Sequence, residues 1–221
     1  MKLGLAAAAA VLVMGAAQAN AQVYVSVNGG MSIMNDADAT DTFTGGSGSG
    51  SIEHDNGYAL TGAIGTTWGP VRIEGELGYR ANDLDSLNVT SLTLAGVGTF
   101  SGLATASLDG DVSALTGMAN VWYDIPTGTN WTPFLGGGIG FANVNMEINH
   151  VGTVATSLDD SDTVFAYQFG AGIGYKVSPQ STVTLSYRFL GTSDTEFSVG
   201  SETIESEYQN HSILLGLNYT F

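Results

Sequence analysis

The chain lacks cysteine and has few cations and few prolines. Its 221 residues include 0 Cys, 4 Pro and 5 Lys+Arg, against 21 Asp+Glu, and the formal net charge is −16. The absence of cysteine excludes disulfides and thiolate metal sites. The scarcity of cations excludes a nucleic-acid-binding role, because binding to phosphate backbones requires a positive surface.

Long apolar runs are missing beyond the N-terminal stretch, so we expect no helical membrane span, which would need about 18 residues or more. The stretch itself has the pattern of a secretory signal peptide: Lys2, an Ala-rich apolar run at 3–17, and small-x-small sites at 17–19 and 19–21. We expect cleavage after Ala19 or Ala21, which gives a signal peptide at 1–21 and a barrel domain at 22–221. Cleavage leaves 4 Lys+Arg against 21 Asp+Glu, a net charge near −17.

Alternating hydrophobicity is abundant, and it is clearest over residues 212–221. One face of this segment carries an apolar row: Ile213, Leu215, Leu217, Tyr219 and Phe221. Strict period two over ten residues predicts a strand with one apolar face. A tilted strand needs about 9–11 residues to cross a bilayer. Because unpaired backbone groups are costly in hydrocarbon, a spanning strand implies a closed barrel.

Eight segments show this alternation, near 22–34, 57–68, 71–82, 114–125, 132–146, 163–177, 182–191 and 212–221. Short connections at 69–70, 126–130 and 178–180 alternate with long ones at 35–56, 83–113, 147–162 and 192–206. This alternation predicts an all-β fold, an eight-stranded antiparallel up-and-down transmembrane β-barrel with four long extracellular loops and periplasmic termini. The first long loop contains a Gly/Ser-rich run at 45–51 that we expect to be flexible.

The second long loop leaves an alternative open. Segments 89–95 and 103–108 have strand-like composition, and a barrel in which both span would have ten strands. They are short and poor in aromatic residues, which favours a small hairpin within the loop.

Charged residues on the strands fall on the inward-facing positions. The candidate interior charge network consists of Arg72, Glu74, Glu76, Arg80, Lys176 and Arg188. A cation on the lipid face would cost about 2–4 kcal/mol at the midplane, so the inward position is physically enforced. These residues either fill the core as an ion-pair network or form a constriction in an aqueous pore. An eight-stranded interior is just wide enough to be filled by its own side chains, which favours the network.

Two neighbouring strands place glycines inward, at 136, 138, 140 and at 170, 172, 174. These glycines make room for Trp122, Phe134 and the arginines, or else leave a narrow cleft. We favour packing.

The acids lie mainly in the predicted loops, which with their edges hold 18 of the 21. Such a rim is typically solvated, although it could bind divalent cations and, through them, lipopolysaccharide phosphates. Asp36-x-Asp38 lacks the full calcium-loop pattern, so we expect neither a metal nor a cofactor. His211 and Ser212 resemble the catalytic pair of lipid A deacylase barrels in type, but adjacent strand residues face opposite sides. We therefore expect no enzyme activity.

Several stretches resemble one family. They are Gly-Ala-Ile-Gly at 62–65 leading into 69–74, Met-Ala-Asn-Val-Trp-Tyr-Asp at 118–124, Pro-Phe-Leu-Gly-Gly-Gly-Ile-Gly at 133–140, and 166–168 through 174–179. They are similar to the major surface antigens of Rickettsiales and wider alphaproteobacterial relatives, close to the opacity-type porin-like proteins. This resemblance implies a surface-exposed barrel with variable loops, whose members include porins, adhesins and antigens.

The final strand also resembles those of other Gram-negative outer-membrane barrels, which commonly end in phenylalanine. The resemblance implies that Tyr219 and Phe221 form an assembly signal read by the barrel-assembly machinery.

Together these observations predict a bacterial outer-membrane protein with a structural or interaction role, as a surface antigen or adhesin-like protein. The alternative is a narrow porin or conduit for small solutes. A soluble ligand-binding barrel such as a lipocalin would instead place its apolar face inward. The expected partners are outer-membrane lipid and lipopolysaccharide, the barrel-assembly machinery, and a host or cell-surface partner bound through the loops.

Overall fold

A computed structural model describes residues 21–34, 37–43, 46–54, 56–94, 98–151, 154–193, 195–199, 202–206 and 208–221. The predicted signal peptide, except for Ala21, lies outside these residues. Within them, no helix is long and apolar enough to cross a membrane.

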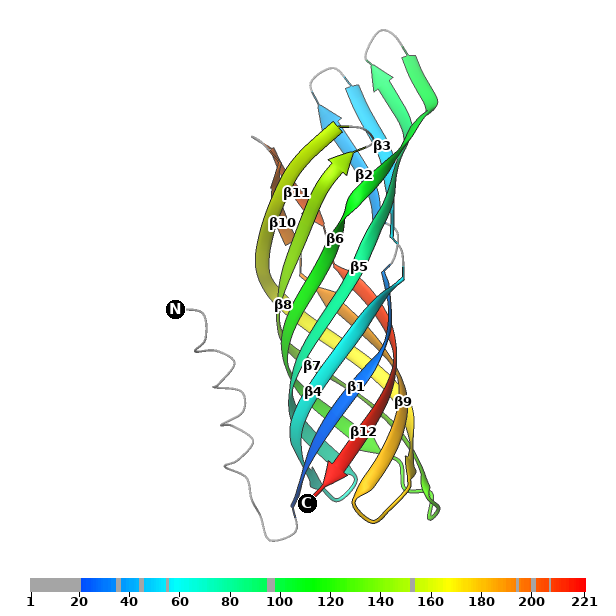
Figure 1. Ribbon diagram of the computed structural model, residues 1–221, viewed down its shortest axis with the longest axis vertical. Coiled ribbons are helices and arrows are strands. Elements are labelled where there is room, and N and C mark those ends of the chain that lie inside the picture. Colours follow the sequence, from blue (N-terminus) through cyan, green and yellow to red (C-terminus); the bar gives the residue numbers. More distant parts are fainter. Residues whose placement is uncertain are drawn as a thin grey trace.

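Eight antiparallel strands close into a barrel (Figure 1). They are β1 (Gln22–Met34), β4 (Gly57–Trp68), β5 (Val71–Leu94), β6 (Gly98–Asp124), β7 (Trp131–Val151), β8 (Val154–Lys176), β9 (Ser181–Thr192) and β12 (Gln209–Thr220). Consecutive strands pair around the ring, and β1 pairs with β12 from Tyr24 opposite Thr220 to Met34 opposite Asn210. The predicted eight-stranded fold is confirmed.

Half of the strands are far longer than a membrane crossing requires. Strands β5, β6, β7 and β8 have 24, 27, 21 and 23 residues, whereas β1, β4, β9 and β12 have 12 or 13. The long strands rise above the barrel on one side of it (Figure 1). Residues 89–94 pair with 98–104 as the outer ends of β5 and β6, and segment 103–108 is part of β6, so the ten-strand alternative is wrong. Outside hydrocarbon both faces can be polar, and the hydrophobic alternation fades although the backbone pairing continues.

Two hairpins extend this outer region. Strands β2 (Ala37–Phe43) and β3 (Gly46–His54) pair with each other, and β3 also pairs with β5. Strands β10 (Thr195–Val199) and β11 (Glu202–Ser206) form a separate two-stranded sheet. Residues 46–51 of the Gly/Ser-rich run therefore belong to a strand, held by main-chain pairing on both edges, and are not an irregular loop.

The opposite rim carries the short turns and the barrel ends of β1 and β12 (Figure 1). Gly69 turns between β4 and β5 with φ of 59°, a left-handed conformation that suits glycine. The Phe221 amide donates to the Val23 carbonyl at 3.0 Å, which ties the end of β12 to the start of β1. In outer-membrane barrels the short turns are periplasmic, so the long strands point outward from the cell.

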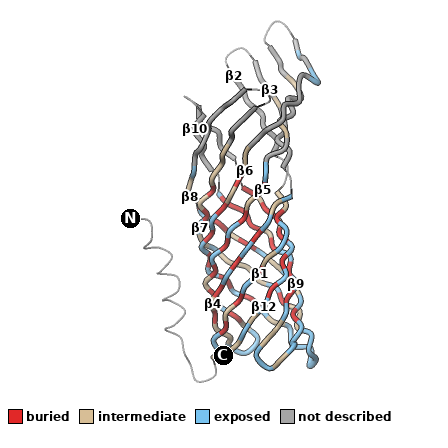
Figure 2. The backbone as a smooth tube through the Cα atoms, in the orientation of Figure 1, coloured by how far each residue is buried: buried red, intermediate tan, exposed pale blue. Residues whose placement is uncertain are grey.

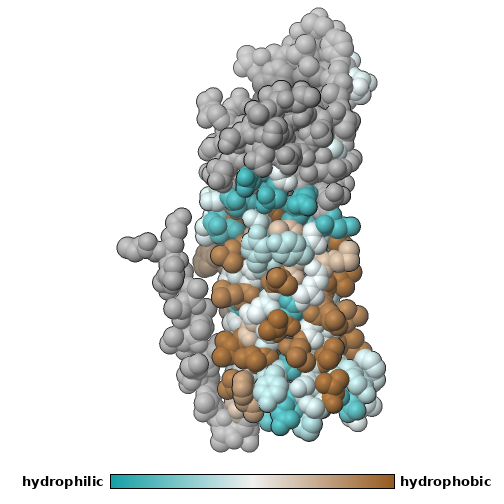
Figure 3. Space-filling model, viewed as in Figure 1, coloured by the Kyte–Doolittle hydropathy of each residue, from teal (hydrophilic) through white to brown (hydrophobic). Residues whose placement is uncertain are grey.

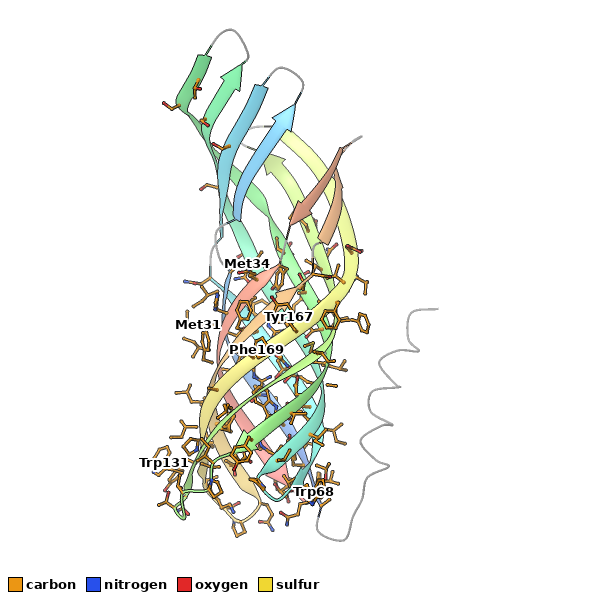
Figure 4. All side chains as sticks on the ribbon, turned by 180° about the vertical axis from the view of Figure 1, so that it is seen from behind. Met31, Met34, Trp68, Trp131, Tyr167 and Phe169 are labelled. Carbon is orange, nitrogen blue, oxygen red and sulfur yellow. The ribbon has the colours of Figure 1, made fainter. Side chains whose placement is uncertain are left out.

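The barrel wall alternates between buried and exposed positions (Figure 2). The outward positions form an apolar belt below a hydrophilic ring (Figure 3). Trp68 and Trp131 lie at the short-turn end of this belt, and Tyr167 and Phe169 lie nearer the other end (Figure 4). Aromatic girdles flanking an apolar band are characteristic of transmembrane barrels.

Candidate functional site

Strand β5 supplies most of the charged interior. Arg72, Glu74, Glu76 and Arg80 occupy alternate inward positions and are all buried. Arg188 joins them from β9 and is 5% exposed. Charges placed this deeply are stable only when they are paired and hydrogen-bonded.

Glu74 is held by neutral donors from two other strands. Its Oε2 accepts a hydrogen bond from the Tyr24 hydroxyl at 2.5 Å. Its Oε1 accepts from Trp122 Nε1 at 2.7 Å and from Asn120 Nδ2 at 3.1 Å. Three donors from β1 and β6 therefore fix one carboxylate in the middle of the barrel.

Glu76 forms a deeply buried ion pair. Its Oε2 accepts from Arg188 Nη1, and its Oε1 accepts from Gln168 Nε2 at 3.1 Å. Gln168 Nε2 also donates to Asn120 Oδ1 at 2.6 Å, which links this pair to the Glu74 group. The Arg188 guanidinium lies 5.0 Å from the centroid of the Trp122 ring. Strands β5, β6, β8 and β9 are thus joined through the barrel interior.

Arg72 pairs with a residue that the predicted network omitted, Asp124 on β6. Arg72 Nε donates to both carboxylate oxygens, at 3.0 and 2.9 Å. Its guanidinium also lies 5.0 Å from the Phe134 ring centroid and 5.8 Å from that of Tyr24. The inward parity of Asp124 on β6 is the sequence signal that could have identified it.

Arg80 and Lys176 behave differently from the other cations. Arg80 is fully buried and donates to the Thr116 hydroxyl at 3.3 Å, but its Nε and Nη2 have no hydrogen-bond partner among the described residues. Lys176, by contrast, is exposed at the last position of β8. The structure therefore does not bring Lys176 into the interior network, because its inward position lies at the rim, where the barrel opens to water.

The inward glycines make room for large side chains. A Cβ on Gly136 would lie 2.7 Å from Trp122 Cε3, and a Cβ on Gly170 would lie 3.1 Å from Trp122 Cη2. A Cβ on Gly172 would lie 2.5 Å from Phe134 Cζ. Trp122 and Phe134 meet edge to face, with centroids 5.9 Å apart. Packing therefore accounts for the space that these glycines leave.

An apolar cluster fills the interior at the level of Arg80, whose partner in the β5–β6 register is Ala114. It consists of Val112, Ala114, Met118, Ala142, Val144, Val164, Ala166, Leu190 and Tyr208, with Met34 and Met146 packed against it. Beside it, Asn82 Oδ1 accepts from the Ser32 hydroxyl at 2.7 Å, and Asn210 Nδ2 donates to Ser32 Oγ at 2.7 Å. The described interior thus holds a level of paired charges and a largely apolar level that contains Arg80.

A small cavity lies beside the charges. A cavity of about 10 Å³ lies among residues that include Arg72, Glu74, Ser186 and Arg188. About one water molecule fits in such a volume.

Other candidate positions do not assemble into a reaction centre. Ser212 is buried and donates to Asn210 Oδ1 at 2.9 Å, whereas His211 faces outward on the same strand. The two residues lie on opposite faces of β12. No cluster of metal-binding side chains occurs within the described part of the chain.

Tyr219 and Phe221 are both exposed on the outward face near the short-turn rim. Their rings meet edge to face with centroids 5.3 Å apart. Together they present an aromatic surface at the end of β12.

A closed eight-stranded barrel with an apolar exterior and a polar, charged interior is an outer-membrane β-barrel. The chain matches the outer membrane protein beta-barrel domain family over residues 3–221 and belongs to that family. It is therefore a protein of the bacterial outer membrane.

Individual relatives are more distant. The chain is 26% identical over 121 residues to the outer membrane protein PagN of Salmonella typhimurium, an alignment covering 50% of this chain and 51% of PagN. It is 27% identical over 135 residues to an uncharacterized protein of Brucella abortus, covering 49% of this chain and 48% of that protein. The chain thus spans about half the length of the curated relatives that it matches. Among solved structures, Neisserial surface protein A (NspA) superposes with a TM-score of 0.53 at 14% identity, covering 90% of this chain and 97% of that chain. This similarity shows the fold alone.

Proposed function

We propose that this barrel is a non-conducting membrane anchor that presents an extracellular β-structure for interaction, in a surface-antigen or adhesin-like role. The observation that carries the proposal is the filled interior. The lumen is occupied by the Glu76–Arg188 pair, the Trp122 ring and the apolar cluster. The cavity beside them has a volume of about 10 Å³.

The long strands support the second half of the proposal. Strand β6 has 27 residues, more than twice the roughly 9–11 that a crossing needs. Together with the β2–β3 hairpin on the edge of β5, the outer ends of β5 to β8 form a sheet beyond the membrane. A sheet continuous with the barrel wall is a better-ordered binding surface than four free loops. A host or cell-surface partner would bind there.

We place the chain, as part of the same proposal, in the alphaproteobacterial branch of major surface antigens and opacity-type proteins. The motifs at 62–74, 118–124 and 133–140 support this assignment. The proposal also includes a non-enzymatic role, since His211 and Ser212 face opposite sides of β12. Assembly through an aromatic signal at Tyr219 and Phe221, both exposed, completes it.

The test is conductance of the refolded chain, residues 22–221, in a planar bilayer, after a heat-dependent gel shift has established folding. We expect no stable single-channel steps. Reproducible steps from the folded protein would refute the anchor and favour the rival narrow porin. A matched variant, Leu190→Ala with Met118→Ala, thins the apolar cluster and tests whether the charged level alone still blocks ions.

A second experiment tests the outer sheet. Cells displaying the full chain are compared with cells displaying a variant in which residues 84–110 are replaced by a short turn. We expect both to fold, and only the full chain to adhere to host cells or to other bacteria. Equal adhesion by both would contradict the proposed role of the sheet.

A further inference from the structure

A histidine and a tyrosine form a hydrogen-bonded pair on the outward face of the barrel, at the extracellular end of its apolar belt. The hydroxyl of Tyr187 on β9 lies 2.6 Å from His211 Nδ1 on β12. Their rings stack, with centroids 5.9 Å apart and an interplanar angle of 28°. Phe189 contacts the imidazole as well, with centroids 5.2 Å apart. The imidazole is therefore held in one orientation on the surface that faces lipid.

Further polar groups surround this pair. Gln209 precedes His211 by two residues on the same face of β12 and pairs with Gly191 on β9. The Tyr167 ring covers Gly191, where an added Cβ would lie 2.6 Å from the Tyr167 hydroxyl oxygen. We call Tyr167, Tyr187, Gln209 and His211 the His211 patch. It combines two phenols, an amide and an imidazole just above apolar side chains.

The described charges at the extracellular rim are unevenly distributed among the strands. Asp83, Asp111 and Glu147 occupy outward positions on β5, β6 and β7, and the register places them in one row. On β9, β12 and β1, the described outward positions carry no acid, whereas the β10–β11 hairpin between β9 and β12 carries Glu196, Glu202 and Glu205. Arg72, Arg80 and Arg188 face inward, and Lys176 lies at the opposite rim. None of these four cations is therefore directed outward at the extracellular rim, where the imidazole of His211 lies.

We propose that the His211 patch binds the phosphate group of an outer-leaflet glycolipid. When the Tyr187 hydroxyl donates to Nδ1, the proton of the neutral imidazole is on Nε2, which leaves Nε2–H as a donor to the ligand. The phenols supply hydrogen bonds to sugar hydroxyls, and the apolar belt below accommodates acyl chains. This inference is independent of the proposed function of the outer sheet.

Native mass spectrometry of the refolded, detergent-solubilised chain, titrated with bis-phosphorylated lipid A, tests the proposal. We expect one tightly bound lipid, and an apparent Kd about tenfold higher for His211→Phe, which keeps an aromatic ring but loses the donor. His211→Gln retains a donor and should recover part of the affinity. Tyr58→Phe is the matched control. Tyr58 on β4 and Tyr79 on β5 form an outward tyrosine pair that does not include a histidine, with ring centroids 6.1 Å apart.

Two further ligands identify the source of the phosphate. Dephosphorylated lipid A should bind about tenfold more weakly than the phosphorylated form, and inorganic phosphate should not compete. Equal binding of both lipids, or an unchanged Kd in His211→Phe, would overturn the proposal. Competition by low-millimolar inorganic phosphate would overturn the lipid assignment in favour of free phosphate. A heat-dependent gel shift for each variant ensures that weaker binding does not reflect misfolding.

Discussion

The Glu76–Arg188 pair offers the sharpest test of the interior. In the variant Glu76→Met, an apolar side chain of similar length replaces the carboxylate, and Arg188 remains buried without its counter-charge. Breaking a buried pair from one side costs about 3–5 kcal/mol. The Trp122 ring, 5.0 Å from the guanidinium, offsets part of this loss. We therefore expect a loss of about 3 kcal/mol in the free energy of unfolding, roughly a hundredfold in the equilibrium constant.

The double variant Glu76→Met/Arg188→Met decides why stability is lost. Removing both charges leaves no uncompensated ion, so we expect its stability to return to within about 1 kcal/mol of the parent or to exceed it. The measurement is equilibrium unfolding in lipid vesicles, followed by tryptophan fluorescence and by the heat-dependent gel shift. Lys176→Met removes an exposed cation and should leave the unfolding midpoint unchanged. A single variant as stable as the parent, or a double variant no more stable than the single one, would refute the pairing argument.

Two further substitutions test the packing and the neutral donors. Gly172→Ala should destabilise the barrel by about 1–3 kcal/mol in the same unfolding assay, because its Cβ would lie 2.5 Å from Phe134 Cζ. The outward Gly62→Ala has no described neighbour closer than 4.0 Å and should be neutral or slightly stabilising, so equal effects would contradict the packing account. Tyr24→Phe removes one of three donors to Glu74 and should cost about 1–3 kcal/mol, and an unchanged midpoint would show that water replaces the hydroxyl.

The membrane-embedded part of the fold is predictable from sequence because lipid imposes a strict rule. A strand in hydrocarbon must show apolar side chains on one face, so parity alone assigns Arg72 and Glu74 inward and Leu77 outward. The extracellular part of the strands is not in contact with lipid, so this constraint does not apply to it. Residues 83–94 and 98–113 continue β5 and β6 with backbone pairing that is interrupted by two register shifts, but water on both faces leaves no hydrophobic period to detect.

The partners within the network were also beyond sequence reasoning. The alternation along a strand tells whether a residue faces the interior or the lipid. Its position along the barrel axis depends on the register between neighbouring strands, which the sequence does not show. Glu74 and Trp122 meet because β5 and β6 pair in one particular register, with Arg72 opposite Trp122. Lys176 has the parity of an interior residue but the depth of a rim residue, and for that reason it lies outside the network.

Closure of the ring has a consequence for how the chain folds. The pairing of β1 with β12 brings Tyr24 opposite Thr220, whereas the β5–β6 and β7–β8 hairpins pair residues that are close in sequence. Contacts between distant segments form slowly, because chain entropy must be lost before they can form. The hairpins are therefore expected to form early and the seam last. Until it does, β1 and β12 each present an open strand edge, the kind of surface on which chains aggregate. The exported chain consequently needs protection from aggregation until its first and last spanning strands, β1 and β12, pair with each other.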